Sequence, residues 1–229
     1  MNLFTFLDLA RQLSYGVQYT LELFFITLIF GLPLGLILGL IRNAGKNLVN
    51  THIKILDDVL NTVISAVVGF YVWIMRGTPL LLQMVFVYFG LAVMQVAALD
   101  PFPAACVTFA LNYAAYFCEI FRGGLLSVEK GQHEAASVLG FTPFKKTIHI
   151  IIPQMFRVCL PTLANECITL VKDTSLIYAL SITEILTLAT DAVRRTTSPA
   201  AYVVAAVFYL IFTFLITQFF KYLEKKFSF

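Results

Sequence analysis

The chain has 229 residues, of which 59% are hydrophobic and 13% are charged, and its mean hydropathy is +0.85. A soluble domain carries about 25% charged residues, so this chain has roughly half the charge that a water-facing surface needs. The formal net charge is only +3, and the chain contains 22 Phe and 10 Tyr. The composition excludes a soluble enzyme, a nucleic-acid-binding protein and a disordered scaffold, and it predicts an all-α integral membrane protein.

Five apolar segments are predicted to cross the membrane, because a spanning helix needs about 20 predominantly apolar residues. Their approximate bounds are 16–41, 58–93, 101–121, 157–180 and 199–220. The five spans together form a single domain over residues 1–229, with a loop at 123–150 between the third and fourth spans.

The second segment is too long for one straight helix. Apolar residues extend from Val59 to Leu99, which as a helix would measure roughly 60 Å, about twice the hydrocarbon thickness. The sequence Arg76-Gly77-Thr78-Pro79 interrupts it. The segment is therefore either two spans or one span with a break.

The positions of the basic residues decide between these alternatives. Basic clusters follow the first span (Arg42, Lys46, Lys54), the third span (Arg122 to Lys146) and the last span (Lys221 to Lys226), and all three should face the cytoplasm. Only one crossing between Lys54 and Pro101 allows this. We therefore predict one discontinuous span broken at Arg76–Pro79, five spans in all, with the N-terminus outside and the C-terminus inside. Arg194 and Arg195 then lie outside, against the rule.

The fourth span carries polar residues that a lipid-facing helix would not tolerate. They are Asn165, Glu166, Lys172, Asp173, Thr174 and Ser175. Glu166 and Asp173 are two helical turns apart and share one face, and Asn165 and Lys172 share the neighbouring stripe. We expect Asn165 and Glu166 to line a substrate path, and residues 172–175 to shape the turn at its outer end. The alternative is a structural ion pair of Glu166 or Asp173 with Arg76 or Lys172.

Two further groups are candidates for the same path. Arg76 lies beside Gly77, Thr78 and Pro79, where a helix break leaves backbone groups and a guanidinium available to a ligand carboxylate. Alternatively, Arg76 extends to the membrane surface. In the third span, Asn112 and Tyr116 are four residues apart and form a polar stripe that faces either the path or a neighbouring helix.

The loop between the third and fourth spans contains a predicted helix–turn–helix. Glu134–Leu139 is predicted to be helical, Gly140 to end that helix in a left-handed conformation, and Thr142 to cap a second helix with Pro143 at its first position. A helix this short needs a surface to dock on. Ala135 and Ala136 would allow close approach, and Glu134 could pair with a basic partner. The alternative is an ordinary cytoplasmic loop.

Catalytic and metal-binding constellations are not evident in the sequence. No segment has the glycine spacing of a phosphate-binding loop, the four cysteines lack a Cys-x-x-Cys spacing, and the three histidines lie in different segments. We therefore expect neither enzymatic activity nor a metal or cofactor in this chain. Uphill transport would need an ion gradient or a partner.

The loop resembles the EAA motif of permease subunits of bacterial ATP-binding-cassette (ABC) importers. The matching residues are Glu134-Ala135-Ala136-x3-Gly140 and, after nine residues, Ile150-x-Ile152-Pro153, with Ile in place of the usual Leu before the proline. Other motifs resemble the branch for polar amino acids, which includes histidine, glutamine, arginine and cystine permeases. They are Tyr19-Thr20-Leu21 with Gly31 and Gly35, Arg76-Gly-Thr-Pro-Leu80-Leu81, Tyr88-Phe-Gly90-Leu91, Ala115-Tyr116, Glu119-Ile-Phe-Arg-Gly123-Gly124, Gly131-Gln132, Pro153-Gln154 and Lys172-Asp-Thr-Ser-Leu176.

The resemblance implies a type I importer in a bacterial cytoplasmic membrane. Two five-span permeases, identical or similar, would form the path within the lipid. A cytoplasmic ABC ATPase dimer would bind ATP and Mg²⁺, and an extracytoplasmic protein would deliver an amino acid. The EAA segment, with Gln132, Glu134, Ala135, Ala136 and Gly140, would couple to the ATPase. An ion-coupled secondary transporter or channel is the alternative, although we find none of the internal repeats it would predict.

Overall fold

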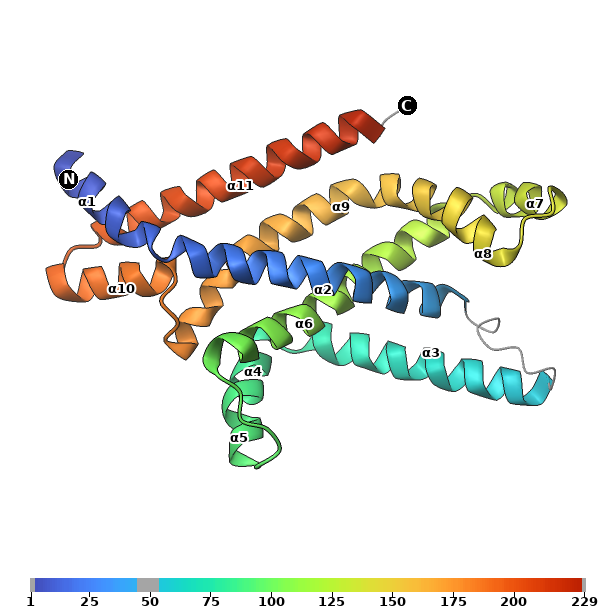
Figure 1. The fold of residues 1–229 in the computed structure, drawn as a ribbon, viewed down its shortest axis with the longest axis horizontal. Helices are drawn as coiled ribbons and strands as arrows, with labels where there is room; N and C mark the ends of the chain where they lie inside the picture. Colours follow the sequence, from blue (N-terminus) through green and yellow to red (C-terminus); the bar gives the residue numbers. More distant parts are fainter. Residues whose placement is uncertain (1–2, 45–53, 228–229) are drawn as a thin grey trace. The chain divides into compact units, whose positions relative to one another are not determined.

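The computed structural model describes residues 3–44 and 54–227, and within these ranges the chain is helical with short connections (Figure 1). The long helices are α2 (Val17–Ala44), α3 (Lys54–Gly77), α6 (Pro101–Ser127), α9 (Ile152–Asp173) and α11 (Ala200–Phe227). The short helical segments are α1 (Leu3–Ser14), α4 (Leu80–Val85), η2 (Phe86–Gly90), α5 (Leu91–Val93), α7 (Lys130–Val138), α8 (Pro143–Lys146), η3 (Thr147–Ile151), η4 (Thr174–Leu180) and α10 (Ile185–Thr196). Lys46, of the first basic cluster, lies outside the described residues.

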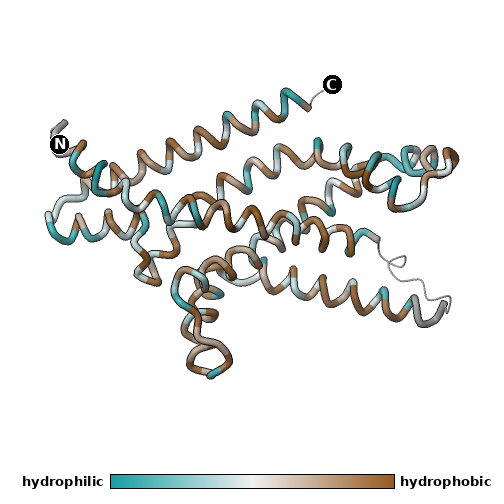
Figure 2. The backbone as a smooth tube through the Cα atoms, viewed as in Figure 1, coloured by the Kyte–Doolittle hydropathy of each residue, from teal (hydrophilic) through white to brown (hydrophobic). Residues whose placement is uncertain are grey.

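Five helical segments of the described chain are long and apolar enough to cross a membrane, which confirms the predicted number of spans. They are Val17–Asn43, Asp58–Gly77, Pro101–Ser127, Pro143–Leu180 and Ala200–Phe227. Figure 2 shows hydrophobic residues along most of α2 and α11, and hydrophilic residues around α7 and α8 and at the end of α10.

The second segment is interrupted where the sequence predicts a break. Helix α3 ends at Gly77, and Pro79, which lacks an N–H, is extended with φ −62° and ψ 132°. The residues from Leu80 to Val93 form a separate, shorter apolar helical run. The fourth segment starts earlier than expected, because α8 continues through the π-helical turn η3 into α9.

The chain divides into two compact units, which are described separately. Unit 1 comprises Met1–Ile29, Pro79–Ala110 and Ala164–Phe219. In it α1 and α10, two helices that the hydropathy pattern does not predict, pack with the start of α11 (Figure 1). Their shared core consists of Leu9, Leu13, Ile185, Ala189, Ala192, Ala201, Val204 and Ala205.

Unit 2 comprises Phe30–Thr78, Leu111–Leu163 and Phe220–Phe229. Helices α2 and α6 approach closely at Gly35, where an added Cβ would lie 2.5 Å from the Cβ of Phe117. Helix α3 packs on α6 through Val68, Val72, Ala115 and Cys118. The Tyr71 hydroxyl also donates to the Leu111 carbonyl (2.5 Å). Small residues thus bring the helices of unit 2 into close contact.

Candidate functional site

The segment between the third and fourth spans forms the predicted helix–turn–helix. Gly140 has φ +76°, and the N–H groups of Gly140 and Phe141 donate to the carbonyls of Ser137 (3.1 Å) and Ala136 (3.1 Å), which is a Schellman motif. Thr142 accepts the Lys145 N–H (3.4 Å) as N-cap of α8, with proline at the next position. The left-handed glycine and the cap are confirmed. Helix α7, however, begins at Lys130 rather than Glu134, so it is longer than expected.

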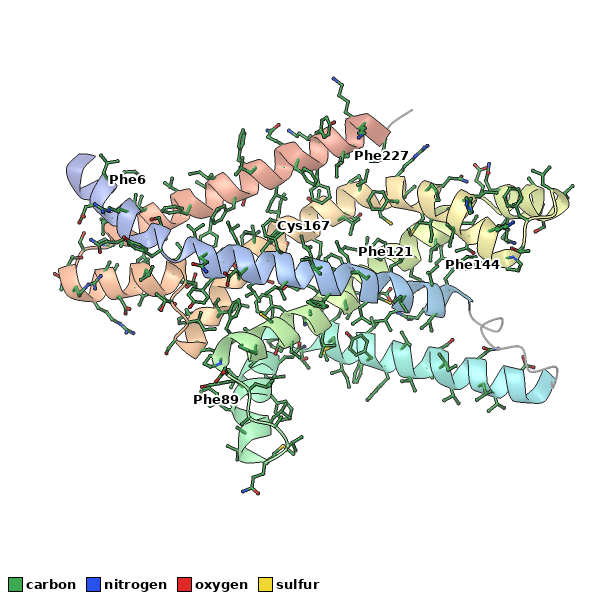
Figure 3. All side chains as sticks on the ribbon, in the orientation of Figure 1. Phe6, Phe89, Phe121, Phe144, Cys167 and Phe227 are labelled. Carbon is green, nitrogen blue, oxygen red and sulfur yellow. The ribbon has the colours of Figure 1, made fainter. Side chains whose placement is uncertain are left out.

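The turn between α7 and α8 exposes large apolar side chains. Val138 is 88% exposed, and Leu139 and Phe144 are each 73% exposed; Phe144 is labelled in Figure 3. Water-facing turns normally carry polar residues, so this concentration marks a contact surface. We call Val138, Leu139 and Phe144 the apolar tip.

The residues of the EAA motif do not all face outward. Glu134 and Ala135 are exposed, but Ala136 is 1% exposed. The small side chain of Ala136 therefore serves packing inside unit 2, not the close external approach expected for it. Gln132 is exposed and accepts a hydrogen bond from Nε2 of Gln154 on α9 (3.4 Å), which connects α7 to the fourth span.

An ion-pair cluster that the sequence reasoning missed joins α2 to α6. Arg42 donates to Oε1 of Glu119, and Arg122 donates to Oε2 through Nε (3.1 Å) and Nη2 (2.8 Å). The Glu119 side chain is 18% exposed, so it needs these cations to offset its desolvation. Arg42 and Glu119 are 77 residues apart, and only the close approach of α2 and α6 brings them together.

Arg76 lies at the C-terminal end of α3 beside a pocket of about 470 Å³ in unit 2. Its guanidinium carbon lies 5.2 Å from the centre of the Tyr116 ring, a cation–π contact. The pocket is also lined by Arg42, Trp73 and Glu119. Its polar walls combine donors with an aromatic surface, an arrangement that can hold a carboxylate.

The other predicted residues near Arg76 have structural contacts. The Thr78 hydroxyl donates to the Ile74 carbonyl (2.8 Å) and so closes the last turn of α3. Asn112 is 3% exposed, and its side-chain amide donates to the Met75 carbonyl (2.8 Å). The sequence predicts that Asn112 faces either the path or a neighbouring helix, and this hydrogen bond to α3 matches the second alternative.

The polar residues of α9 separate into an exposed stripe and a more buried face. Asn165, Thr169 and Lys172 are exposed and follow one another at helical spacing, while Glu166 and Asp173 are half-buried. The Thr169 hydroxyl donates to the Asn165 carbonyl (3.1 Å). Because exposed polar groups in a membrane span avoid lipid, this stripe belongs to a surface covered by protein or water.

Thr174 and Ser175 lie where α9 passes into the 3₁₀ helix η4, the turn expected there. Thr174 is fully buried, and its hydroxyl donates to the Val171 carbonyl (2.8 Å). Through this hydrogen bond Thr174 stabilises the turn. Because its side chain is buried, it is not part of the exposed stripe of α9. Ser175 is half-buried.

Glu184 is a buried carboxylate that the sequence reasoning missed. It is 0% exposed and caps α10 by accepting the backbone N–H groups of Leu186 (2.8 Å) and Thr187 (2.6 Å). The hydroxyls of Thr187 and of Tyr209 on α11 also donate to it (3.1 Å each). Burial raises the pKa of the Glu184 carboxyl above its ordinary value of 4.5, and these hydrogen bonds offset the rise only in part.

Comparison with known proteins agrees with this architecture. Residues 58–229 match the family described as binding-protein-dependent transport system inner membrane component. The L-cystine transport system permease protein TcyB of Bacillus subtilis is 36% identical over 226 residues, covering 96% of this chain and 90% of that protein. The glutamine transport system permease protein GlnP of Escherichia coli is 34% identical over 158 residues, covering 68% of this chain and 72% of that protein.

Two solved structures share the fold. One, described as an amino acid ABC transporter with histidines, superposes with a TM-score of 0.83 at 26% identity, covering 99% of both chains. The other, the MetNI methionine ABC transporter in an inward-facing conformation, has a TM-score of 0.75 at 19% identity, covering 94% of this chain and 96% of that one. The chain therefore belongs to the family of binding-protein-dependent transport system inner membrane components, and it is a multi-pass membrane permease with the type I ABC importer fold.

Proposed function

We propose that this chain is the membrane-spanning subunit of an ATP-driven uptake system for amino acids. A cytoplasmic ATPase dimer binds ATP and Mg²⁺, a second permease completes the path, and an extracytoplasmic protein delivers the substrate. The N-terminus lies outside and the C-terminus inside, as the basic clusters require. The identities of TcyB and GlnP, whose names specify cystine and glutamine, support an amino acid substrate.

The apolar tip carries the coupling part of the proposal. Val138, Leu139 and Phe144 lie outside the hydrophobic core of unit 2 and surround a rigid Schellman turn. A rigid turn with apolar side chains enters a groove without first losing conformational freedom, which favours docking of a separate subunit. Glu134, exposed on α7, supplies a charge for a basic residue of the ATPase.

The exposed stripe of α9 and the pocket beside Arg76 support the path. Asn165 and Lys172 face outward from unit 1, and Glu166 is next to this stripe. In unit 2 the guanidinium of Arg76 is available to a substrate carboxylate. Within unit 1 we assign Glu166 to an ammonium group that passes along the path, and residues 173–175 to shaping its outer end. Separately, within unit 2 we assign Arg76, which Tyr116 orients, to a carboxylate group.

Co-purification with the ATPase tests the coupling surface directly. Leu139→Glu places a charge in the apolar tip without changing the turn, and we expect about a tenfold or greater loss of ATPase recovered with the permease, because a buried unpaired charge costs several kcal/mol. Val96→Glu is the matched control, since Val96 is also exposed (69%) but lies in unit 1 before α6. Normal ATPase recovery with Leu139→Glu would refute the assignment.

A further inference from the structure

Another pocket, of about 460 Å³, lies within unit 1 and plays no part in the proposed path. Its walls come from α1, from the end of α10 and from the start of α11, three segments that pack on one core (Figure 1). The lining residues are Asp8, Leu9, Gln12, Arg195, Thr196, Ser198 and Ala200.

The pocket holds a negative and a positive charge that are separated by an amide. Nε2 of Gln12 donates to Oδ2 of Asp8 (2.9 Å), and Nη2 of Arg195 donates to Oε1 of Gln12 (3.5 Å). Within residues 3–44 and 54–227, neither Asp8 nor Arg195 takes part in an ion pair. Gln12 thus keeps the two charges apart, and they do not neutralise each other. A zwitterionic ligand needs such a pair of separate, opposite charges.

The position of the pocket relative to the two spans indicates its level in the membrane. Its α1 residues precede the span that starts at Val17, and Ala200, its one lining residue in α11, is the first residue of the span Ala200–Phe227. Both spans therefore begin at the pocket, which places it at the level of the lipid head groups. Two exposed tyrosines, Tyr15 (69%) and Tyr202 (42%), lie within three residues of the lining residues Gln12 and Ala200 in the sequence, and tyrosine is enriched at this level of a membrane.

We propose that this pocket binds the head group of a phospholipid that carries a primary ammonium, of the phosphoethanolamine class. The guanidinium of Arg195 contacts the phosphate oxygens, and the carboxylate of Asp8 accepts an N–H from the ammonium. Ser198 offers a hydroxyl donor beside the phosphate, whereas the Thr196 hydroxyl already donates to the Ala192 carbonyl (2.8 Å). A choline head group has no N–H to donate, and a glycerol head group has no cation for Asp8, so both should bind less well.

The lipid content of the purified transporter complex tests the proposal. The complex is exchanged into detergent containing equal amounts of phosphatidylethanolamine, phosphatidylcholine and phosphatidylglycerol with identical acyl chains, and the retained lipids are counted by native mass spectrometry. We expect phosphatidylethanolamine to be retained about two- to fivefold over the others, the range of one partly exposed ion pair. Equal retention of all three lipids would overturn the proposal without any variant.

Variants assign each charge to its contact. Asp8→Asn should remove the preference over phosphatidylcholine and phosphatidylglycerol, and Arg195→Gln should lower retention of all three lipids, because each carries the phosphate. Arg194→Gln is the control, because Arg194 is 77% exposed, faces Asp191 (3.8 Å) and does not line the pocket. A loss with Arg194→Gln equal to that with Arg195→Gln would show general charge attraction and overturn the proposal.

A free amino acid carries the same two charges, and competition separates the two sources. A large excess of glutamine should leave the retained phosphatidylethanolamine unchanged, because glutamine lacks the acyl chains that extend from the head group into the bilayer. Displacement of the lipid by glutamine would make the pocket an amino acid site and overturn the lipid assignment.

Discussion

Replacing Glu184 with alanine should destabilise the chain more than replacing any exposed acid. The carboxylate is fully buried and receives four hydrogen bonds, two from the first turn of α10 and one each from the hydroxyls of Thr187 and Tyr209. It therefore holds α10 to α11 and keeps the end of α10 correctly formed. Alanine removes every acceptor at once and leaves the buried donors without a partner.

The expected loss follows from these contacts. Removing an N-cap acceptor costs about 1 kcal/mol, and leaving a buried donor such as the Tyr209 hydroxyl unpaired costs about 1–3 kcal/mol more. With the cavity left by the side chain, the total is about 4 kcal/mol. At about 2–4 °C per kcal/mol for a chain of this size, Tm should fall by about 8–16 °C.

Thermal unfolding of the purified complex in detergent, followed by intrinsic fluorescence, measures this fall. Glu129→Ala is a matched control, because Glu129 is the N-cap residue of α7 but its side chain is exposed and makes no capping hydrogen bond. Its Tm should change by less than about 2 °C. If Glu184→Ala shifts Tm no more than Glu129→Ala does, the buried network does not hold α10, and the reasoning is wrong.

Two further predictions concern ionisable groups. Burial raises the pKa of Glu184 above 4.5, so over a range of pH the folded chain keeps a proton that the unfolded chain releases, and Tm should fall as pH rises from about 4.5 through the raised pKa. Glu184→Gln should flatten this dependence of Tm on pH, and an unchanged slope of Tm against pH in that variant would contradict the prediction. Glu166→Gln should reduce the initial rate of amino acid uptake about tenfold with assembly intact. The control is Glu22→Gln, the same change at a carboxylate that accepts a hydrogen bond from Gln18 (2.7 Å), and it should leave the rate unchanged. Equal uptake rates for the two variants would remove Glu166 from the path.

Local signals in the sequence predict the spans and the turn of the coupling segment. A glycine that must adopt a positive φ and a Thr-Pro pair that starts a helix act within a few residues, so Gly140 and Thr142 could be interpreted without tertiary information. The break before Pro79 was predictable for the same reason, since proline cannot donate to the preceding turn.

Hydropathy alone does not reveal the two short amphipathic helices. Polar residues such as Asp8, Gln12, Arg194 and Arg195 lower the mean hydropathy of α1 and α10, so neither has the apolar run that marks a span. The periodic spacing of Leu9 with Leu13, and of Ile185 with Ala189 and Ala192, is the signal that could have found them.

The Arg42–Glu119 ion pair and the burial of Glu184 could not be predicted from the sequence, because both depend on contacts between different helices. Nothing near Glu119 in the sequence specifies Arg42 as a partner, because the pairing depends on how closely α2 packs on α6. Glu184 likewise lies in an unremarkable stretch, and glutamate is not among the favoured N-cap residues. Its burial depends on α10 and α11 packing together around it.

The energy source is the central claim, and uptake into proteoliposomes tests it most directly. The complete transporter with its binding protein is reconstituted, and uptake of a panel of radiolabelled amino acids is measured with ATP on the ATPase side or with an imposed proton or sodium gradient. We predict uptake with ATP alone, none with a gradient alone, and loss of the ATP-driven uptake in Leu139→Glu. Gradient-driven uptake without ATP would contradict the account and identify an ion-coupled transporter.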